Sequence, residues 1–163
     1  MIKVVATYGW IEYLANATAT ATPTNLNFGS TIAANLAPST YPITAGTYSY
    51  EKWVRAYFSG SFTRIDNIQF WKSAGAYVSG ETIAWTGQQT AYAAPTTTAS
   101  VYATTALPTA DPGTDNVSIG GSLSGSLTST GYSDYMILQT SVTTAASAGA
   151  TNTKTLTLQY DEI

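Results

Sequence analysis

The chain has 163 residues, of which 44% are apolar and 9% are charged, and it contains neither Cys nor His. The lack of Cys excludes a disulfide framework, a zinc ribbon and a thiol nucleophile, and the lack of His excludes a Ser-His-Asp triad. The net charge of −3 offers no basic footprint for nucleic acid, and the apolar content suffices for the core of one folded domain.

The composition points to a surface made of hydroxyl groups rather than charges. Thr, Ser and Ala dominate the sequence, and charged residues are far rarer than the roughly 25% of an ordinary soluble domain. Such a surface provides little like-charge repulsion between copies, which suits a protein that packs densely against other proteins. The alternative is a biased composition with no functional meaning.

No targeting or membrane signal is visible in the sequence. The first ten residues lack the long apolar run of a secretory signal. No apolar run approaches the about 20 residues that a membrane-spanning helix needs. We therefore expect no membrane partner and a protein that is made and used without export.

The N-terminal quarter of the chain gives weak structural signals. Ile2–Tyr8 is a candidate first strand, and Glu12–Ala19 and Ile32–Leu36 are candidates for a turn or two of helix. Residues 15–46 are rich in Ala, Thr, Asn and Pro. This segment is expected to be either an arm that becomes ordered on a neighbouring subunit or a long loop.

The remainder of the chain shows the period-two alternation of strands. Turn-rich linkers separate these segments, and no helical spacer lies between them. The pattern predicts a single all-β domain over residues 1–163, folded as an antiparallel β-sandwich or jelly roll with an extended N-terminal arm or long loops. The expected strands are Ser49–Phe58, Phe62–Trp71 (taken as the continuation of a hairpin), Ala76–Trp85, Ser133–Thr144 and Thr155–Tyr160.

Carboxylates are the only acid–base groups of this chain that titrate below neutral pH. Glu51 and Asp66 would approach each other if the first two of these strands were neighbours, as a glycosidase pair requires. Both have basic residues beside them in the sequence, so ordinary ion pairs explain them equally well. We expect no catalytic residue and no enzymatic activity.

The stretch Asp111–Asn116 resembles a cluster of oxygen ligands for Ca²⁺. It lacks the distal Glu and the fixed spacing of an EF-hand loop, and Asp, Pro and Gly are also the residues that β-turns prefer. We expect a turn there, with no metal and no cofactor.

Aromatic residues are concentrated in the middle of the chain, on both faces of the expected strand Ser49–Phe58. Trp53 and Tyr57 share one face with Arg55, and four of the six basic residues fall between positions 52 and 72. Three explanations remain open: a core covered on both faces, a protein interface, or a platform on which sugars stack. In the last case Trp71 or Trp85 would carry the sugar.

The stretch Tyr50–Lys72 resembles the central sheet of small virion proteins from tailed bacteriophages. The closing stretch Thr155–Ile163 resembles the C-terminal strand of such proteins. The short, Cys-free, Thr- and Ala-rich profile is similar to that of capsid decoration, or cement, proteins.

This resemblance implies a β-sandwich on the capsid surface of the virion, made in the host cytoplasm. It implies that the chain forms a homotrimer and bridges subunits of the major capsid protein. The alternative is a carbohydrate- or receptor-binding module of a phage fibre. We expect the interface at two groups of residues: Trp53, Arg55 and Tyr57 on the strand, and Leu26, Phe28, Ile32 and Leu36 in the N-terminal segment.

Overall fold

The computed structural model describes residues 6–146 and 152–163, and within them the chain is all-β with no helix. The two expected helical turns are therefore wrong. Glu12 lies in a strand, and Ile32–Leu36 lies in a loop. Residues 14–19 connect two strands that pair with each other, which explains why a helix does not form there.

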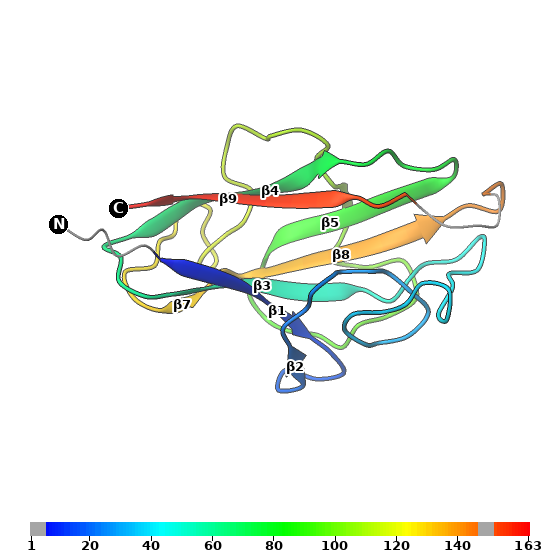
Figure 1. Cartoon of the computed structure of the whole chain (residues 1–163), viewed down its shortest axis with the longest axis horizontal. Helices are drawn as coiled ribbons and strands as arrows, with labels where there is room; N and C mark the ends of the chain where they lie inside the picture. The colour runs from blue at the N-terminus through cyan, green and yellow to red at the C-terminus, as the bar shows by residue number, and fades with distance from the viewer. Residues whose placement is uncertain (1–5, 147–151) are drawn as a thin grey trace.

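In the described part of the chain, nine strands form two antiparallel sheets, which pack against each other as in the predicted sandwich (Figure 1). Sheet A has seven strands in the order β2-β1-β3-β8-β5-β6, and β7 also pairs with β3. Sheet B consists of β4 and β9 alone. The strands are β1 Thr7–Tyr13, β2 Thr20–Ala21, β3 Lys52–Ser59, β4 Ile65–Ala74, β5 Glu81–Gln89, β6 Thr105–Ala106, β7 Gly131–Tyr132, β8 Tyr135–Val142 and β9 Thr155–Glu162.

Most of the long strands lie within a few residues of the predicted ones. The first strand is displaced: it was expected at Ile2–Tyr8 and is observed at Thr7–Tyr13, and residues 2–5 of the expected strand lie outside the described part. The two-residue strands β2, β6 and β7 were not predicted, because two residues are too short to show a period of two.

The expected hairpin between the segments Ser49–Phe58 and Phe62–Trp71 is wrong. β3 pairs with β1 and β8, whereas β4 pairs with β9 in the other sheet. The connection near Gly60, which has a φ of 99°, therefore crosses from one sheet to the other. The alternation within each strand was read correctly, but the identity of its neighbours depends on contacts far along the chain.

The main core lies between the two sheets. Alternate residues of β3 (Val54, Ala56 and Phe58) point into it and have no exposed surface. They meet Ile65, Ile68 and Phe70 from β4, which are equally buried. This is the arrangement that period-two burial produces in a sandwich.

A second apolar cluster covers the opposite face of sheet A. It contains Tyr13, Trp53, Tyr135 and Ile137, and residues 92–103 pack over it. Gln139 fastens this covering segment, because its side chain bonds to the backbone of Thr98 and Ser100. The central strands of sheet A are therefore buried on both faces.

Residues 15–46 lie against their own chain. Gly29 O accepts a hydrogen bond from Tyr50 N at 3.0 Å, and Gly46 N donates one to Val142 O at 2.7 Å. Leu36 is only 3% exposed. Apart from β2, the segment is thus a long loop folded onto sheet A in this structure, and not an extended arm.

No helix in the described ranges has the length and apolar character to cross a membrane.

Candidate functional site

Trp53 does not lie at the surface, although we expected it at an interface. Its side chain has no exposed area and packs edge-on against Tyr92, Tyr102 and Tyr135 at centroid distances of 5.2–5.5 Å. Its indole N–H donates to Glu51 Oε2 at 3.1 Å. A partner cannot reach Trp53 unless residues 92–103 move away, so the expected interface has to exclude it.

The four apolar residues expected to anchor an arm are directed toward this chain. Leu36 is buried, and Leu26 and Phe28 are half-buried and pack against the main core. Ile32 is half-buried as well. These side chains stabilise the loop on its own sheets, which leaves little of their apolar surface for another subunit.

Arg55 and Tyr57 remain partly exposed and form the most distinctive surface feature of the sandwich. They lie on the face of β3 that points away from the main core. We call this surface the tyrosine patch, and it consists of Gly9, Ile11, Arg55, Tyr57 and Tyr132.

Strand register explains why these residues meet. Gly9 and Ile11 on β1 lie directly opposite Tyr57 and Arg55, and Tyr132 on β7 lies opposite Tyr57 from the other side. Residues directly opposite each other in an antiparallel pair share one face. A Cβ atom at Gly9 would find nothing within 4 Å, so the surface beside Tyr57 is open.

The aromatic rings and the guanidinium of the tyrosine patch are stacked. The Tyr57 and Tyr132 rings lie 4.7 Å apart with a tilt of 37° between their planes. The Arg55 Cζ atom lies 5.0 Å from the centre of the Tyr132 ring and 4.8 Å from that of Tyr135. Arg55 Nε also donates to Ser133 O. The guanidinium is thus held in place, while Tyr132 stays 39% exposed.

The charge of Arg55 is not neutralised by a carboxylate among the described residues. The salt bridges in that part of the chain join Lys52 to Glu12, Arg64 to Asp66, and Lys154 to Glu81. Tyr and Arg are among the side chains that protein interfaces enrich, because they combine a large contact area with directional hydrogen bonds. The tyrosine patch can therefore bind an apolar surface that carries an acceptor or an acidic group.

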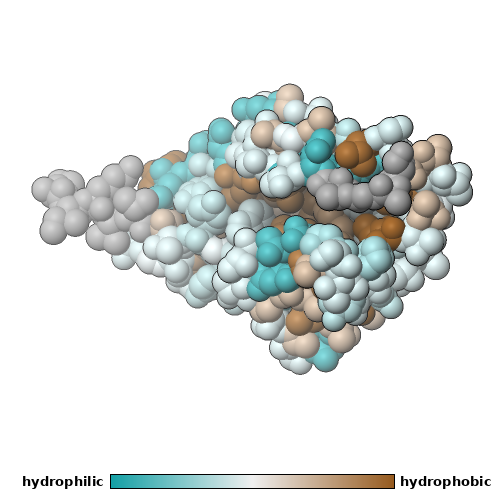
Figure 2. Space-filling model, turned by 45° about the vertical axis from the view of Figure 1, so that its right-hand side comes forward, coloured by the Kyte–Doolittle hydropathy of each residue, from teal (hydrophilic) through white to brown (hydrophobic). Residues whose placement is uncertain are grey.

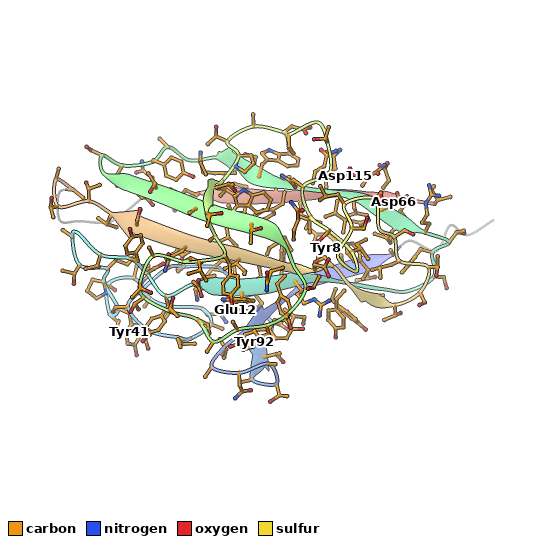
Figure 3. All side chains as sticks on the ribbon, turned by 180° about the vertical axis from the view of Figure 1, so that it is seen from behind. Tyr8, Glu12, Tyr41, Asp66, Tyr92 and Asp115 are labelled. Carbon is orange, nitrogen blue, oxygen red and sulfur yellow. The ribbon has the colours of Figure 1, made fainter. Side chains whose placement is uncertain are left out.

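The structure separates the two carboxylates considered for catalysis. Glu51 precedes β3 in sheet A, where its Oε2 accepts from Trp53 and Thr96. Asp66 lies on β4 in sheet B (Figure 3). It pairs with Arg64, with 2.6 Å between Asp66 Oδ2 and Arg64 Nε. Asp66 therefore has the ion pair that we considered as the alternative. Glu51 instead accepts hydrogen bonds and forms no salt bridge with a described residue, and the two carboxylates belong to different sheets.

The Asp111–Asn116 stretch forms a turn. Asp111 Oδ1 accepts from Gly113 N at 2.8 Å, and Gly113 has the positive φ of 66° that glycine favours. Asn116 is used elsewhere, since its side chain bonds to both the N–H and the C=O of Phe70. Within residues 6–146 and 152–163, no three acidic side chains come together as a metal site would require.

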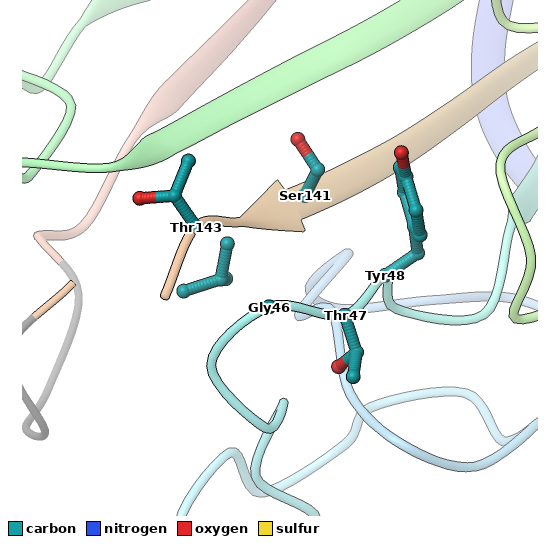
Figure 4. Close-up of a pocket in the computed structure, with 6 residues that line it drawn as sticks. Gly46, Thr47, Tyr48, Ser141 and Thr143 are labelled. Carbon is teal, nitrogen blue, oxygen red and sulfur yellow. The ribbon is translucent and has the colours of Figure 1, made fainter. Parts of the chain in front are cut away.

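A shallow pocket lies where the loop 46–48 meets the end of β8 (Figure 4). Its volume is about 170 Å³, whereas small-molecule sites usually measure about 300–1,000 Å³. Gly46, Thr47, Tyr48 and residues 141–143 line it, and none of them is charged. Hydroxyl groups line part of this pocket, but it is smaller than an ordinary ligand site.

Sequence reasoning missed Gly9, Ile11 and Tyr132 of the tyrosine patch. Tyr132 and Tyr135 lie three positions apart, and this is a local sequence signal of a second segment that carries aromatic residues. The pairing of Tyr132 with Tyr57, which lies 75 positions earlier, cannot be detected in a single sequence.

Comparisons with protein-family models, with curated proteins and with solved structures find no match.

Proposed function

We propose that the chain is a structural virion protein of a tailed phage, which binds the outside of the capsid and bridges major capsid subunits through the tyrosine patch. The observation that carries the proposal is the exposed Tyr57–Tyr132 stack beside an Arg55 guanidinium that no described carboxylate neutralises. Rigid aromatic rings lose little conformational entropy on binding, which is why such residues dominate the affinity of protein interfaces.

The composition supports the same proposal. A chain in which only 9% of the residues are charged meets neighbouring proteins with little electrostatic repulsion. A capsid offers many equivalent junctions between its subunits. Modest contacts at each junction add up over the shell, so a small bridging protein needs no chemistry of its own to stabilise it.

A binding assay on capsids tests the proposal. Particles stripped of the chain, or assembled without it, are mixed with the wild-type protein and with Tyr57→Ala/Tyr132→Ala, and binding is measured by co-sedimentation. We expect the double variant to bind at least tenfold more weakly, because it removes both rings of the Tyr57–Tyr132 stack. The matched control is Tyr41→Ala, since Tyr41 is 41% exposed in a loop away from the tyrosine patch.

Two results would overturn this proposal. One is that wild-type protein fails to bind the capsids at all, and the other is that the double variant binds as well as the wild type. A circular dichroism spectrum of the double variant, compared with that of the wild type, establishes that both are folded.

The second candidate is a carbohydrate- or receptor-binding module, and the exposed Tyr132 ring favours it. Trp71 and Trp85, which we considered as stacking residues, are only 8% and 5% exposed, so the sugar would have to stack on Tyr57 or Tyr132. Glycan binding that is abolished by Tyr132→Ala, together with no binding to capsids, would favour this candidate.

A further inference from the structure

Tyrosines are the most accessible oxidisable side chains in the described part of the chain. Most of the visible surface has an intermediate hydropathy, as expected of Thr, Ser and Ala, and these side chains do not readily give up single electrons (Figure 2). Phenols, indoles and thioethers do. Met136 and Trp53 have no exposed surface, Trp71 and Trp85 are nearly buried, and Trp10 is half-buried. An oxidant in solution therefore meets tyrosine rings first.

Four tyrosines are between 39% and 43% exposed: Tyr8, Tyr41, Tyr48 and Tyr132. A phenoxyl radical on such a ring becomes a stable product when a second tyrosine lies within reach. Neither Tyr41 nor Tyr48 pairs with another ring among the described residues. The Tyr8 ring lies 5.7 Å from that of Tyr160, at 70° to it. The Tyr132 ring lies only 4.7 Å from that of Tyr57, so Tyr132 has the closest neighbour of the four.

Ring orientation also distinguishes the Tyr57–Tyr132 pair. Two tyrosines couple through the ring carbons beside their hydroxyl groups, so the edges of the two rings have to meet. The 37° tilt between Tyr57 and Tyr132 allows this with a small rotation. Tyr13 and Tyr135 are almost as close, at 4.9 Å, but one ring edge points at the other ring's face. Those two rings are also only 9% and 7% exposed, which keeps them from a dissolved oxidant.

Strand pairing holds Tyr57 and Tyr132 together in the folded protein. They lie directly opposite each other on β3 and β7, a position in which Cβ atoms are about 4.5–5.5 Å apart. Ala56 N donates to Ser133 Oγ at 3.0 Å, and Ser133 N donates to Ala56 O at 2.9 Å. These two bonds fix β7 on β3 immediately beside the pair. The Arg55 guanidinium contacts the Tyr132 ring as well, which limits its movement.

We propose that Tyr57 and Tyr132 form an oxidation site, at which a one-electron oxidant couples the two rings into a dityrosine cross-link. Each phenol loses one electron and one proton and becomes a phenoxyl radical. Tyr57 is half-buried and is oxidised through Tyr132, because electrons exchange between rings in contact.

The coupling step balances with hydrogen peroxide as the final electron acceptor. The two radicals form one C–C bond between the carbons beside their hydroxyl groups. The hydrogens on these two carbons leave as protons, and the two oxygens each take up a proton, which restores both phenols. One molecule of peroxide accepts the two electrons and two protons lost at the start and is released as two molecules of water.

The cross-link would join β3 covalently to β7 in a chain that has no Cys for a disulfide. The linked residues lie far apart in the sequence, so the bond restricts the unfolded chain as a disulfide across a long loop does. Cross-linked protein should therefore unfold at a higher urea concentration than unmodified protein. The proposal goes beyond the capsid function and does not rest on it, because it concerns the isolated chain.

Treatment of the purified protein with a haem peroxidase and hydrogen peroxide tests the proposal. We expect the blue fluorescence of dityrosine and a chain whose mass is lower by two hydrogen atoms. Proteolysis should release a linked pair of peptides that contain Tyr57 and Tyr132. Because both rings belong to one chain, the product should migrate as a monomer on a denaturing gel, and its yield per chain should not change on dilution.

Single hydroxyl deletions assign the product to this pair. Tyr57→Phe and Tyr132→Phe keep both rings in the stack but remove one phenol, so we expect each to lose the product within one chain. Tyr41→Phe is the matched control, since Tyr41 is 41% exposed and has no neighbouring ring among the described residues. It should leave the yield unchanged, as should Tyr8→Phe. Circular dichroism establishes that the variants are folded.

The proposal is wrong if the wild type forms no dityrosine while free tyrosine couples in the same reaction. Equal yields from the wild type and Tyr132→Phe would also overturn it, as would a product that links only separate chains. Capsid binding is measured on protein that has not been oxidised. Failure of either proposal therefore leaves the other standing.

Discussion

Lys52 and Glu12 form an ion pair, with 2.7 Å between Nζ and Oε1, although their side chains are only 3% and 2% exposed. The same Nζ donates to Ala33 O at 2.8 Å, so this one ammonium joins β3, β1 and the loop that follows β2. The second carboxylate oxygen of Glu12 is buried without a hydrogen-bond partner among the described residues. The pair therefore fastens the N-terminal loop to sheet A and leaves Glu12 strongly dependent on Lys52.

Lys52→Met removes the cation and leaves a buried carboxylate unpaired. We expect the free energy of unfolding to fall by about 3–5 kcal/mol, the usual cost of breaking a buried pair from one side. Urea denaturation measures it. The control is Lys52→Met/Glu12→Leu, which replaces both partners by apolar groups and should recover most of the loss. A single variant within about 1 kcal/mol of the wild type would contradict the prediction.

Glu12 makes the free energy of unfolding depend on pH. Burial raises the pKa of Glu12, and the Lys52 hydrogen bond and charge offset only part of this rise. The folded protein thus holds this proton more tightly than the unfolded chain does. The contribution of Glu12 to the free energy of unfolding is therefore greatest below its unfolded-state pKa, and it is lost as the pH rises through the folded-state pKa.

Glu12→Gln isolates this contribution, because all other carboxylates are shared with the wild type. We expect the stability of the wild type relative to Glu12→Gln to decrease as the pH is raised from about 4, the ordinary range of a Glu carboxyl. Urea titrations of both proteins across this range give the difference. A relative stability that increased with pH would show that Lys52, rather than burial, dominates the pKa of Glu12.

The strands could be predicted from the sequence because their signal is local. Leu156, Leu158 and Tyr160 alternate with polar residues, and this pattern needs no knowledge of the partner strand. Pairing could not be predicted in the same way. The short turn at Gly60 suggests a hairpin, yet β4 pairs with β9, about 90 residues further along the chain. Such a pairing depends on which distant strands bury each other's apolar faces.

The candidate site was predictable only in part, for the same reason. Arg55 and Tyr57 were found because they alternate on one strand. Trp53 belongs to the same alternation, but it is buried because residues 92–103 cover it, about 40 positions later. Aromatic residues on both faces of a strand indicate that another protein segment covers each face. Only the fold decides whether that cover comes from the same chain or from a partner.

Trp53→Ala should be among the most destabilising substitutions in this chain. It removes the ring at the centre of the second cluster and leaves Glu51 Oε2 without its indole donor. We expect a loss of about 3–5 kcal/mol in the free energy of unfolding. Val101→Ala is the control, since Val101 is 79% exposed and should change stability by less than about 0.5 kcal/mol. Similar small effects for both variants, in urea denaturation, would argue against a buried second cluster.

The N-terminal loop should behave as part of the folded domain. Leu36 is 3% exposed, and the loop around it is fastened by Lys52 and by the bond from Tyr50 N to Gly29 O. Leu36→Ala leaves a cavity, so we expect a loss of about 2–5 kcal/mol in the free energy of unfolding. Because the loop also opens more often, limited proteolysis should cut within residues 24–46 faster than in the wild type.

Leu123→Ala is the matched control for this prediction, because it makes the same chemical change at a position that is 36% exposed. It should leave both the urea midpoint and the cleavage rate close to those of the wild type. If residues 15–46 were instead an arm that becomes ordered only on a neighbour, Leu36→Ala would leave the stability of the isolated protein unchanged. The wild-type segment would then also be cut rapidly before any unfolding. The buried Leu36 and the Lys52 contact argue for the opposite result: slow cleavage in the wild type and a clear acceleration in Leu36→Ala.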